Sequence, residues 1–134
     1  ALGTDFLLGH PGESEAVWEE MMERARILPL THAHLFIYSP RNNTPSSRLK
    51  IDIPNIVAKK RLKELECLIE EKNREFRSKK PALTVLCEKG KNGIYGGYDQ
   101  FFNKIEVRSK INLEKKWLTL TNYEVGNEKN FATV

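Results

Sequence analysis

Residues 31–49 read THAHLFIYSPRNNTPSSRL, and this stretch decides the fold of the first part of the chain. Ala33, Leu35 and Ile37 alternate with more polar or aromatic residues, which predicts a half-buried strand. Pro40 ends the strand because proline has no N–H for a sheet ladder. The polar residues 41–47 then predict a cationic loop at the carboxyl end of a strand, which is where α/β proteins place ligand sites.

The residues before this stretch predict a second strand and a helix. Residues 6–8, FLL, form a short apolar run typical of a buried parallel strand. Ser14 is a suitable N-cap for a helix over residues 15–28, which Pro29 ends. We expect one apolar stripe on this helix, made of Val17, Met21, Met22, Ala25 and Leu28. Strand, helix and strand with short connections predict a right-handed βαβ unit with parallel strands.

Length and cysteine content restrict the class of protein. The 134 residues, 40% of them apolar, are enough for one domain or two small ones. The two cysteines, Cys67 and Cys87, lie in unrelated segments, so they predict neither a metal site nor a disulfide, as in a reducing cytosol. No segment approaches the ~20 apolar residues of a membrane span. We therefore expect a soluble cytoplasmic protein, and the lone strand at the start predicts the C-terminal piece of a longer chain.

The net charge of +4 is unevenly distributed. Residues 1–55 carry five basic and seven acidic side chains, whereas residues 56–80 carry nine and five. The latter segment predicts a helix over residues 56–79 that packs through one apolar face, with basic side chains on its solvent faces, Arg61 and Arg77 among them. A polyanion partner fits this charge better than a membrane does, and a solvated basic face without a partner explains it equally well.

Residues 82–134 predict a small β-barrel. Five strands are expected, over residues 83–88, 94–98, 101–107, 113–122 and 130–134, with glycine and asparagine in the turns between them. Short strands at regular spacing favour a closed barrel of the OB type, a class that often binds oligonucleotides.

Other motifs have a functional and a structural interpretation. His32 and His34 share one strand face, but no further ligand of suitable spacing completes a metal site. The glycines of GHPGE, residues 9–13, place backbone amides near a helix start, a geometry that binds anions. No serine, cysteine or carboxylate pair forms a recognisable catalytic site.

Three segments together resemble the radical S-adenosylmethionine methylthiotransferases. Residues 3–14, GTDFLLGHPGES, resemble that family's G-x-D-h-I-x-G-F-P-G-E-T, with His10 in place of phenylalanine. Residues 36–45, FIYSPRNNTP, resemble F-x-Y-S-x-R-x-G-T-P, with Asn43 in place of glycine, which a left-handed backbone would tolerate. Residues 97–105, GYDQFFNKI, resemble G-Y-T-x-N-Y-x-x-V of the TRAM domain, a small RNA-binding barrel.

The resemblance implies an α/β protein in three parts. Residues 1–55 would be the last units of a (β/α)6 radical-SAM half-barrel, residues 56–81 a linker helix and residues 82–134 a TRAM barrel. The family transfers a methylthio group by means of S-adenosylmethionine and two [4Fe-4S] clusters. Its cluster ligands lie upstream, and no CxxxCxxC motif occurs here. We therefore expect the chain alone to hold no cluster, to lack a catalytic residue and to be inactive.

The resemblance also implies two binding sites. The wall of the S-adenosylmethionine site would comprise Leu8, Gly9, Pro11, Tyr38, Ser39 and Arg41. The RNA-binding set would comprise Lys89, Lys91, Tyr98, Phe101, Lys104, Arg108, Lys110, Lys115 and Lys116. Arg41 indicates a tRNA substrate, because relatives that modify a ribosomal protein have glutamate there. Residues 34–39 resemble most the branch acting on N6-threonylcarbamoyladenosine at position 37 of the tRNA anticodon stem-loop, and N6-isopentenyladenosine is the alternative.

Two other classes of function remain open from sequence. The chain could be a non-catalytic RNA-binding module, or a small-molecule-binding α/β domain without a nucleic-acid partner. A CxxxCxxC motif upstream would distinguish the enzyme from both, and RNA binding by the barrel would exclude the last.

Overall fold

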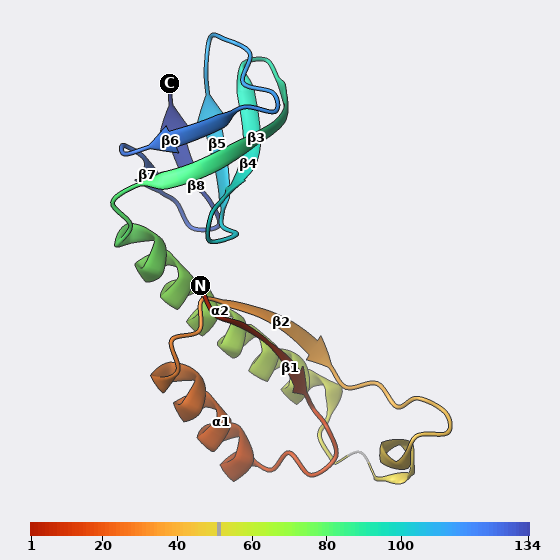
Figure 1. Ribbon diagram of the computed structural model, residues 1–134. Coiled ribbons are helices and arrows are strands. Elements are labelled where there is room, and N and C mark those ends of the chain that lie inside the picture. Colours follow the sequence, from red (N-terminus) through yellow and green to blue (C-terminus); the bar gives the residue numbers. More distant parts are fainter. Residues whose placement is uncertain (51) are drawn as a thin grey trace. The chain divides into compact units, whose positions relative to one another are not determined.

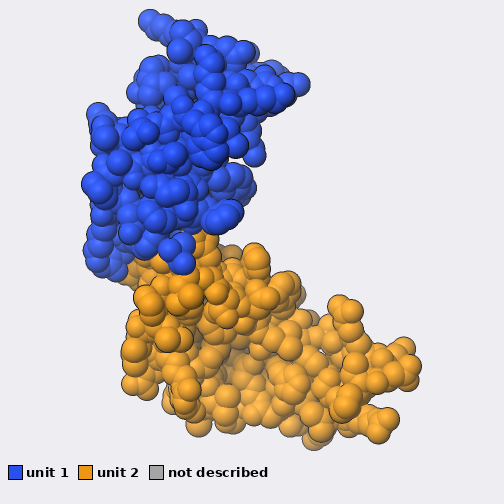
Figure 2. Space-filling model, viewed as in Figure 1, with its two compact units in different colours: residues 1, 73–134 blue, residues 2–72 orange. Residues whose placement is uncertain are grey.

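A computed structural model describes residues 1–50 and 52–134, which form two compact units. The first unit along the chain comprises residues 2–72 and is drawn in orange as unit 2 in Figure 2; the second comprises residues 73–134 together with Ala1 and is drawn in blue as unit 1. The elements are, in chain order, β1 (Gly3–Leu8), α1 (Glu15–Ile27), β2 (His32–Ile37), the 3-10 helix η1 (Pro45–Arg48), α2 (Asn55–Ser78), β3 (Leu83–Lys91), β4 (Ile94–Asp99), β5 (Lys104–Arg108), β6 (Trp117–Leu120), β7 (Glu124–Val125) and β8 (Asn130–Thr133) (Figure 1).

The first unit contains the predicted strand, helix and strand. β1 and β2 pair in parallel, with Leu8 opposite Ile37, so the predicted parallel pairing is confirmed. Ser14 caps α1 as expected, and its hydroxyl accepts a hydrogen bond from the Val17 N–H at 3.3 Å. The core of this unit contains Leu8, Trp18, Met22, Ala25, Leu30, Leu65 and Ile69.

The predicted stripe on α1 is partly wrong. Val17 and Leu28 are about half exposed, whereas Trp18 is buried in the core. Met22 and Ala25 are buried as predicted, so the buried face is turned toward Trp18 by only part of the about 100° that separates successive residues. Trp18 takes the inward position because its large ring removes more apolar surface from water than Val17 would.

One face of the two-stranded sheet is open. Leu7 and Phe36 lie opposite each other in the register, and each is 52% exposed. Parallel sheets are usually covered on both faces, so this sheet is unusual on its own. A larger sheet, as in the expected half-barrel, remains a prediction.

Helix α2 begins and ends one residue before its predicted bounds. Most of its lysines are exposed as expected, but the prediction that Arg61 and Arg77 lie on solvent faces is wrong, because they are only 4% and 1% exposed. A buried guanidinium is stable only when its N–H groups have acceptors. Both arginines have several acceptors, which are described below.

Arg77 fixes the end of α2 within the second unit. Its Nη1 donates to Asn130 Oδ1 at 2.8 Å, and its Nη2 donates to the carbonyls of Gly126 and Asn127 at 2.9 and 2.6 Å. Its Nε donates to Asn73 Oδ1 at 2.7 Å. Burial lowers the pKa of Arg77 and outweighs the Asp99 carboxylate, whose negative charge would raise it.

The second unit is a curled, mixed six-stranded sheet with the order β6-β3-β4-β5-β8-β7 (Figure 1). Only β5 and β8 pair in parallel. The edge strands β6 and β7 are joined by residues 121–123 alone, so the sheet must curl to bring its two edges near each other. Its core contains Leu83, Val85, Cys87, Ile105, Val107, Leu113, Leu120 and Ala132, which gives the unit a barrel-like form.

Two predicted strands of the barrel are too long. Residues 101–103 are not part of β5, because the Asp99 carboxylate accepts the N–H groups of Phe101 and Asn103 at 2.8 and 2.9 Å and folds them into a turn. Within the strand predicted over residues 113–122, only residues 117–120 form a strand, which is β6. The two-residue strand β7 was not predicted. None of the described helices is long and apolar enough to cross a membrane.

Candidate functional site

The carboxyl ends of β1 and β2 bring most of the expected cofactor residues together. The Tyr38 N–H donates to the Leu8 carbonyl at 2.8 Å, so the segments that leave the two strands start side by side. Leu8 and Pro11 are buried and Tyr38 is half-buried. Ser39 and Arg41 follow Tyr38 in an exposed segment. The carboxyl edge of a parallel sheet is where α/β proteins place ligands, so a cofactor site at these residues stays a prediction.

The ring of Tyr38 lies at the centre of this edge. Its centroid is 4.9 Å from that of His10, in an edge-on contact, and His10 Nδ1 lies 2.8 Å from the Pro11 carbonyl. The Tyr38 hydroxyl is buried, and no described residue gives it a hydrogen bond. A buried hydroxyl without a partner is a polar group that a bound ligand can satisfy.

The loop over residues 9–13 depends on two glycines with a positive φ, +73° at Gly9 and +89° at Gly12. A Cβ atom at Gly9 would lie 2.8 Å from the Ala58 Cβ, so α2 packs directly on the Gly9 backbone. A hollow of about 290 Å³ adjoins this loop and is lined by Leu7, His10, Pro11, Gly12, Glu13, Val17, Trp18 and Met21.

Glu13 and Arg61 hold this loop in place. The Glu13 carboxylate accepts the Gly9 N–H at 2.8 Å and Arg61 Nη1 at 2.6 Å. Arg61 also donates to Glu15 Oε2 at 2.6 Å, and its guanidinium lies 5.4 Å from the Trp18 ring centroid. Burial alone would lower the pKa of Arg61, but the hydrogen bonds that it donates to the Glu13 and Glu15 carboxylates outweigh burial and raise the pKa. The charge is therefore held permanently beside the loop.

The loop after β2 has the backbone that its sequence predicted. Asn43 has a φ of +66°, which confirms that asparagine stands at a left-handed position. Thr44 closes a turn on Arg41, because its hydroxyl donates to the Arg41 carbonyl at 2.8 Å. The Arg41 side chain is exposed, so it is available to a ligand that approaches this edge.

The described residues do not fit an iron–sulfur cluster. No group of three histidine, cysteine, aspartate or glutamate side chains that could hold a metal occurs in residues 1–50 and 52–134. Cys67 is exposed on α2, while Cys87 is buried in β3, where burial raises the pKa of its thiol. His34 lies 3.1 Å from the Asp5 carboxylate on the open face of the sheet.

The expected RNA-binding cations are all exposed, and the barrel brings some of them into rows. Lys104 lies opposite Tyr98 in the strand register. Ile94 lies between two cations, because it pairs with Arg108 of β5 on one side and with Lys91 of β3 on the other. Lys115 and Lys116 lie beside β3, because the Lys115 N–H donates to the Cys87 carbonyl and the Cys87 N–H donates to the Lys116 carbonyl. Lys110 lies in the exposed segment after β5, and Lys89 is near the end of β3.

The two expected aromatic residues are in different environments. Tyr98 is on the outer face of β4, whereas Phe101 packs edge-on against Phe76 with ring centroids 5.3 Å apart. Lys80 Nζ lies 4.9 Å from the Phe101 ring centroid. Sequence reasoning missed Trp117, although its alternation with the core residue Leu120 marks it as an outward residue of β6.

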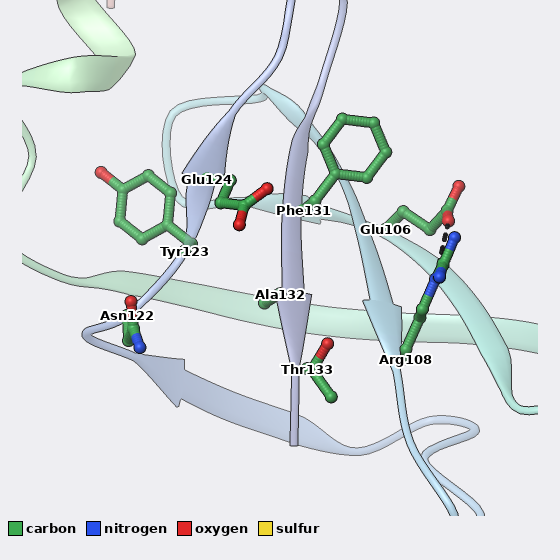
Figure 3. A pocket seen from close by; sticks show the side chains of 8 residues that line it. All are labelled: Glu106, Arg108, Asn122, Tyr123, Glu124, Phe131, Ala132 and Thr133. Carbon is green, nitrogen blue, oxygen red and sulfur yellow. Dashed lines mark ion pairs between the residues drawn. The ribbon is translucent and has the colours of Figure 1, made fainter.

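A second hollow, of about 430 Å³, lies on the barrel and is lined by Glu106, Arg108, Asn122, Tyr123, Glu124, Phe131, Ala132 and Thr133 (Figure 3). Arg108 Nε is 3.8 Å from Glu106 Oε1 here, and Lys129 Nζ is 2.6 Å from Glu106 Oε2. The hydrogen bond from Lys129 is the main reason that the pKa of Glu106 is lowered. Arg108 is thus the expected RNA-binding cation whose charge an acidic neighbour partly neutralises.

Comparison with known proteins identifies relatives along the whole chain, although no family model matches it. It is 42% identical over 136 residues to the "Putative methylthiotransferase" of Helicobacter pylori (strain J99), covering 98% of this chain and 32% of that protein. It is 32% identical to the "tRNA-2-methylthio-N(6)-dimethylallyladenosine synthase" of Bacillus subtilis (strain 168), covering 87% of this chain and 26% of that protein.

A third relative has a different modified nucleoside in its name. The "Threonylcarbamoyladenosine tRNA methylthiotransferase MtaB" of Aquifex aeolicus is 37% identical over 79 residues, covering 59% of this chain and 19% of that protein. The chain thus spans about a third of the length of the first relative and less of the others. The match to the first relative includes both strand ends and the loop that Arg61 holds, so the chain is a homologue of about a third of a protein named as a methylthiotransferase.

Proposed function

We propose that the chain is the C-terminal part of a tRNA methylthiotransferase, in which it closes the S-adenosylmethionine site and binds the tRNA. The observation that carries this proposal is the meeting of β1 and β2 at Leu8 and Tyr38, within a chain whose relatives are methylthiotransferases. The expected parts are the end of a radical-SAM half-barrel at residues 1–55, a linker helix at 56–81 and an OB-like TRAM barrel at 82–134. Its tRNA substrate would place the enzyme in the cytoplasm.

The cofactor side of the proposal rests on the loop at the carboxyl edge of the sheet. Leu8, Gly9 and Pro11 would form one wall for S-adenosylmethionine, and Tyr38, Ser39 and Arg41 the other. When bound there, S-adenosylmethionine would supply the radical chemistry of the reaction, and these residues would hold and orient it. The unpartnered Tyr38 hydroxyl is suited to a hydrogen bond with a polar group of the ligand. Glu13 and Arg61 would keep the Gly9 backbone in a fixed position while the ligand binds and leaves.

The substrate would be a modified adenosine at position 37 of the anticodon stem-loop. Relatives are named for dimethylallyladenosine and for threonylcarbamoyladenosine, and both names specify tRNA. Residues 34–39 favour N6-threonylcarbamoyladenosine. The exposed position of Arg41 is compatible with contact to the cofactor or to an RNA phosphate.

RNA binding by the chain can be tested by salt titration with an anticodon stem-loop. Three to five phosphate contacts would give a slope of roughly −0.7 per contact in log K against log salt, or about a 20- to 130-fold loss between 50 and 200 mM. Replacing Lys115 and Lys116 by alanine should weaken binding to all sequences and flatten the slope by roughly one unit.

The matched control replaces Lys59 and Lys60, which are exposed on α2, by alanine. This variant loses the same charge from the unit that does not contain the barrel, so its slope should stay near that of the parent chain. No binding at 50 mM salt, or a flat salt dependence, would remove the chain as an RNA contact of the enzyme.

A further inference from the structure

Three large side chains form a row across adjacent strands of the barrel. Trp117 of β6 lies opposite Leu86 of β3, which lies opposite Tyr98 of β4. The three side chains are 67%, 38% and 44% exposed, respectively. Lys104 of β5 lies opposite Tyr98 and ends the row. The row therefore presents two aromatic rings and a cation on the outer face of one sheet.

These side chains face solvent because of strand alternation and not because of poor packing. Val85 and Cys87, on either side of Leu86, are in the barrel core, and so is Leu120 of β6. A one-residue change of register would bury the row and expose this core. The barrel is thus fully packed while Trp117 and Tyr98 remain outside it. Large exposed apolar side chains that are contiguous mark a binding surface.

Gly96 leaves open space on this face, opposite the irregular part of β3 between Cys87 and Gly90. It lies on the outer side of β4, two residues before Tyr98, and a Cβ atom there would meet nothing within 4 Å. Its φ is not positive. Gly97 differs, because a Cβ atom there would lie 2.4 Å from the Leu86 carbonyl. A glycine inside a strand accompanies a bulge or leaves room for another group, and Gly96 meets both descriptions.

The charges around the row favour an anion. Lys104 ends it, and Lys116 directly precedes Trp117; both are exposed. The acidic neighbour of Gly96 in the register is Glu106, whose carboxylate is bound by Lys129 at 2.6 Å. Glu88 is the exposed acid on the adjoining part of β3. An occupant that combines flat apolar groups with negative charge fits this surface best.

We propose that the row of Trp117, Leu86 and Tyr98 is a stacking platform for unpaired nucleobases, with Lys104 at the phosphate that links them and Gly96 leaving room for the backbone. This inference rests on the proposed function in that RNA is the occupant. Aromatic side chains beside a basic groove bind single strands with little sequence preference, since every base has a π-face. The platform would hold nucleotides of a loop, and the separate lysines 115 and 116 would hold phosphates.

The test compares two RNA probes of equal length on the full 134-residue chain. One is an unstructured single strand, and the other is a fully paired hairpin stem. Trp117→Ala should weaken binding of the single strand by about 5- to 150-fold, the equivalent of one lost stacked base, and leave the duplex unaffected. Its salt slope should not change, because no phosphate contact is lost. Trp117→Phe should restore most of the affinity.

Two further variants separate stacking from an effect on folding. Gly96→Val should not lower the unfolding midpoint, because the site is open and valine favours strands, yet it should weaken single-strand binding. Phe102→Ala is the matched control, since Phe102 is 79% exposed but lies in the turn before β5, outside the row. Single-strand RNA should also quench the fluorescence of Trp117 but not that of Trp18, which is buried.

The outcomes distinguish the two proposals. Equal effects of Trp117→Ala on single strand and duplex, or none on either, would overturn the platform while salt-dependent binding through Lys115 and Lys116 left the proposed function in place. Failure of the parent chain to bind either probe would overturn both. If RNA bound to the complete protein without quenching the fluorescence of Trp117, the row would contact another part of that protein and not RNA.

Discussion

Arg61 and Glu13 form a buried ion pair, with Nη1 and Oε1 2.6 Å apart, that joins helix α2 to the loop after β1. The side chains of both residues are largely buried, and the same carboxylate accepts the Gly9 N–H. The pair therefore fixes the backbone of the loop that we assign to the cofactor, although neither side chain needs to touch the cofactor. Glu13 and Arg61 are positioning residues in this proposal.

Arg61→Met should destabilise the first unit by about 3 kcal/mol, because it leaves Glu13 with an uncompensated charge in a buried position. The matched control is Lys60→Met, at the residue just before Arg61. The Lys60 side chain is 78% exposed, so this variant should change stability by less than about 0.5 kcal/mol. Urea unfolding followed by circular dichroism measures both. Similar midpoints for the two variants would show that the buried pair contributes no stability.

Gly9→Ala should be more destabilising than Gly12→Ala. Both positions have a positive φ, which costs a residue with a side chain about 1–2 kcal/mol. The alanine at position 9 would in addition press on Ala58, whereas nothing lies within 4 Å at position 12. Ala58→Gly should therefore partly rescue Gly9→Ala but not Gly12→Ala. A double-mutant cycle from thermal unfolding checks this, and additive effects would refute the close contact.

Arg77→Lys should destabilise the barrel by about 2 kcal/mol or more, since an ammonium group cannot reproduce the fork that binds Asn130 and two carbonyls. Arg74→Lys, at an exposed site three residues earlier on α2, is the control and should be nearly neutral. Amide hydrogen exchange in β8 reports on this unit specifically. Unaltered protection of β8 in Arg77→Lys would mean that the helix end does not stabilise the barrel.

Arg41→Glu, introduced into the complete enzyme, should reduce turnover with tRNA by an amount equivalent to about 1.5–3 kcal/mol, the range of a charge-assisted hydrogen bond. The fold should be unaffected, because Arg41 is exposed in a loop. Arg48→Glu, an exposed residue of η1, gives the same change of charge nearby as a control. Equal kinetics for both variants would assign Arg41 to the solvent surface.

The first unit was largely predictable from sequence because its local signals agree with one another. Ser14, Pro29 and Pro40 mark ends of elements, and in the structure these elements end within a few residues of the marked positions. Asn43 has the left-handed backbone expected of it. The cofactor edge follows from this order, since parallel strands place their carboxyl ends together.

The buried arginines and the outer row of the barrel were less predictable. Nothing in the sequence pattern distinguishes Arg61 and Arg77 from the exposed lysines beside them. Their burial depends on acceptors that are distant in the chain, Glu13 for Arg61 and Asn130 for Arg77. The strand positions of Trp117, Leu86 and Tyr98 predict their outward direction, but their alignment depends on the register of three strands. Sequence periodicity does not determine that register, because it reports on each strand separately.

The short connection between β6 and β7 has a consequence for the order of folding. β6 pairs with β3 and β7 pairs with β8, at opposite edges of the sheet, although residues 121–123 alone separate them. β7 and β8 form a local antiparallel hairpin across residues 126–129, so β7 can reach its partner without the other strands. The hairpin joins the sheet only through the pairing of β8 with β5, which is distant in the chain. Docking of the hairpin on β5 should thus be a late event in folding, and the two-residue edge strand β7 should detach early when the native barrel opens locally.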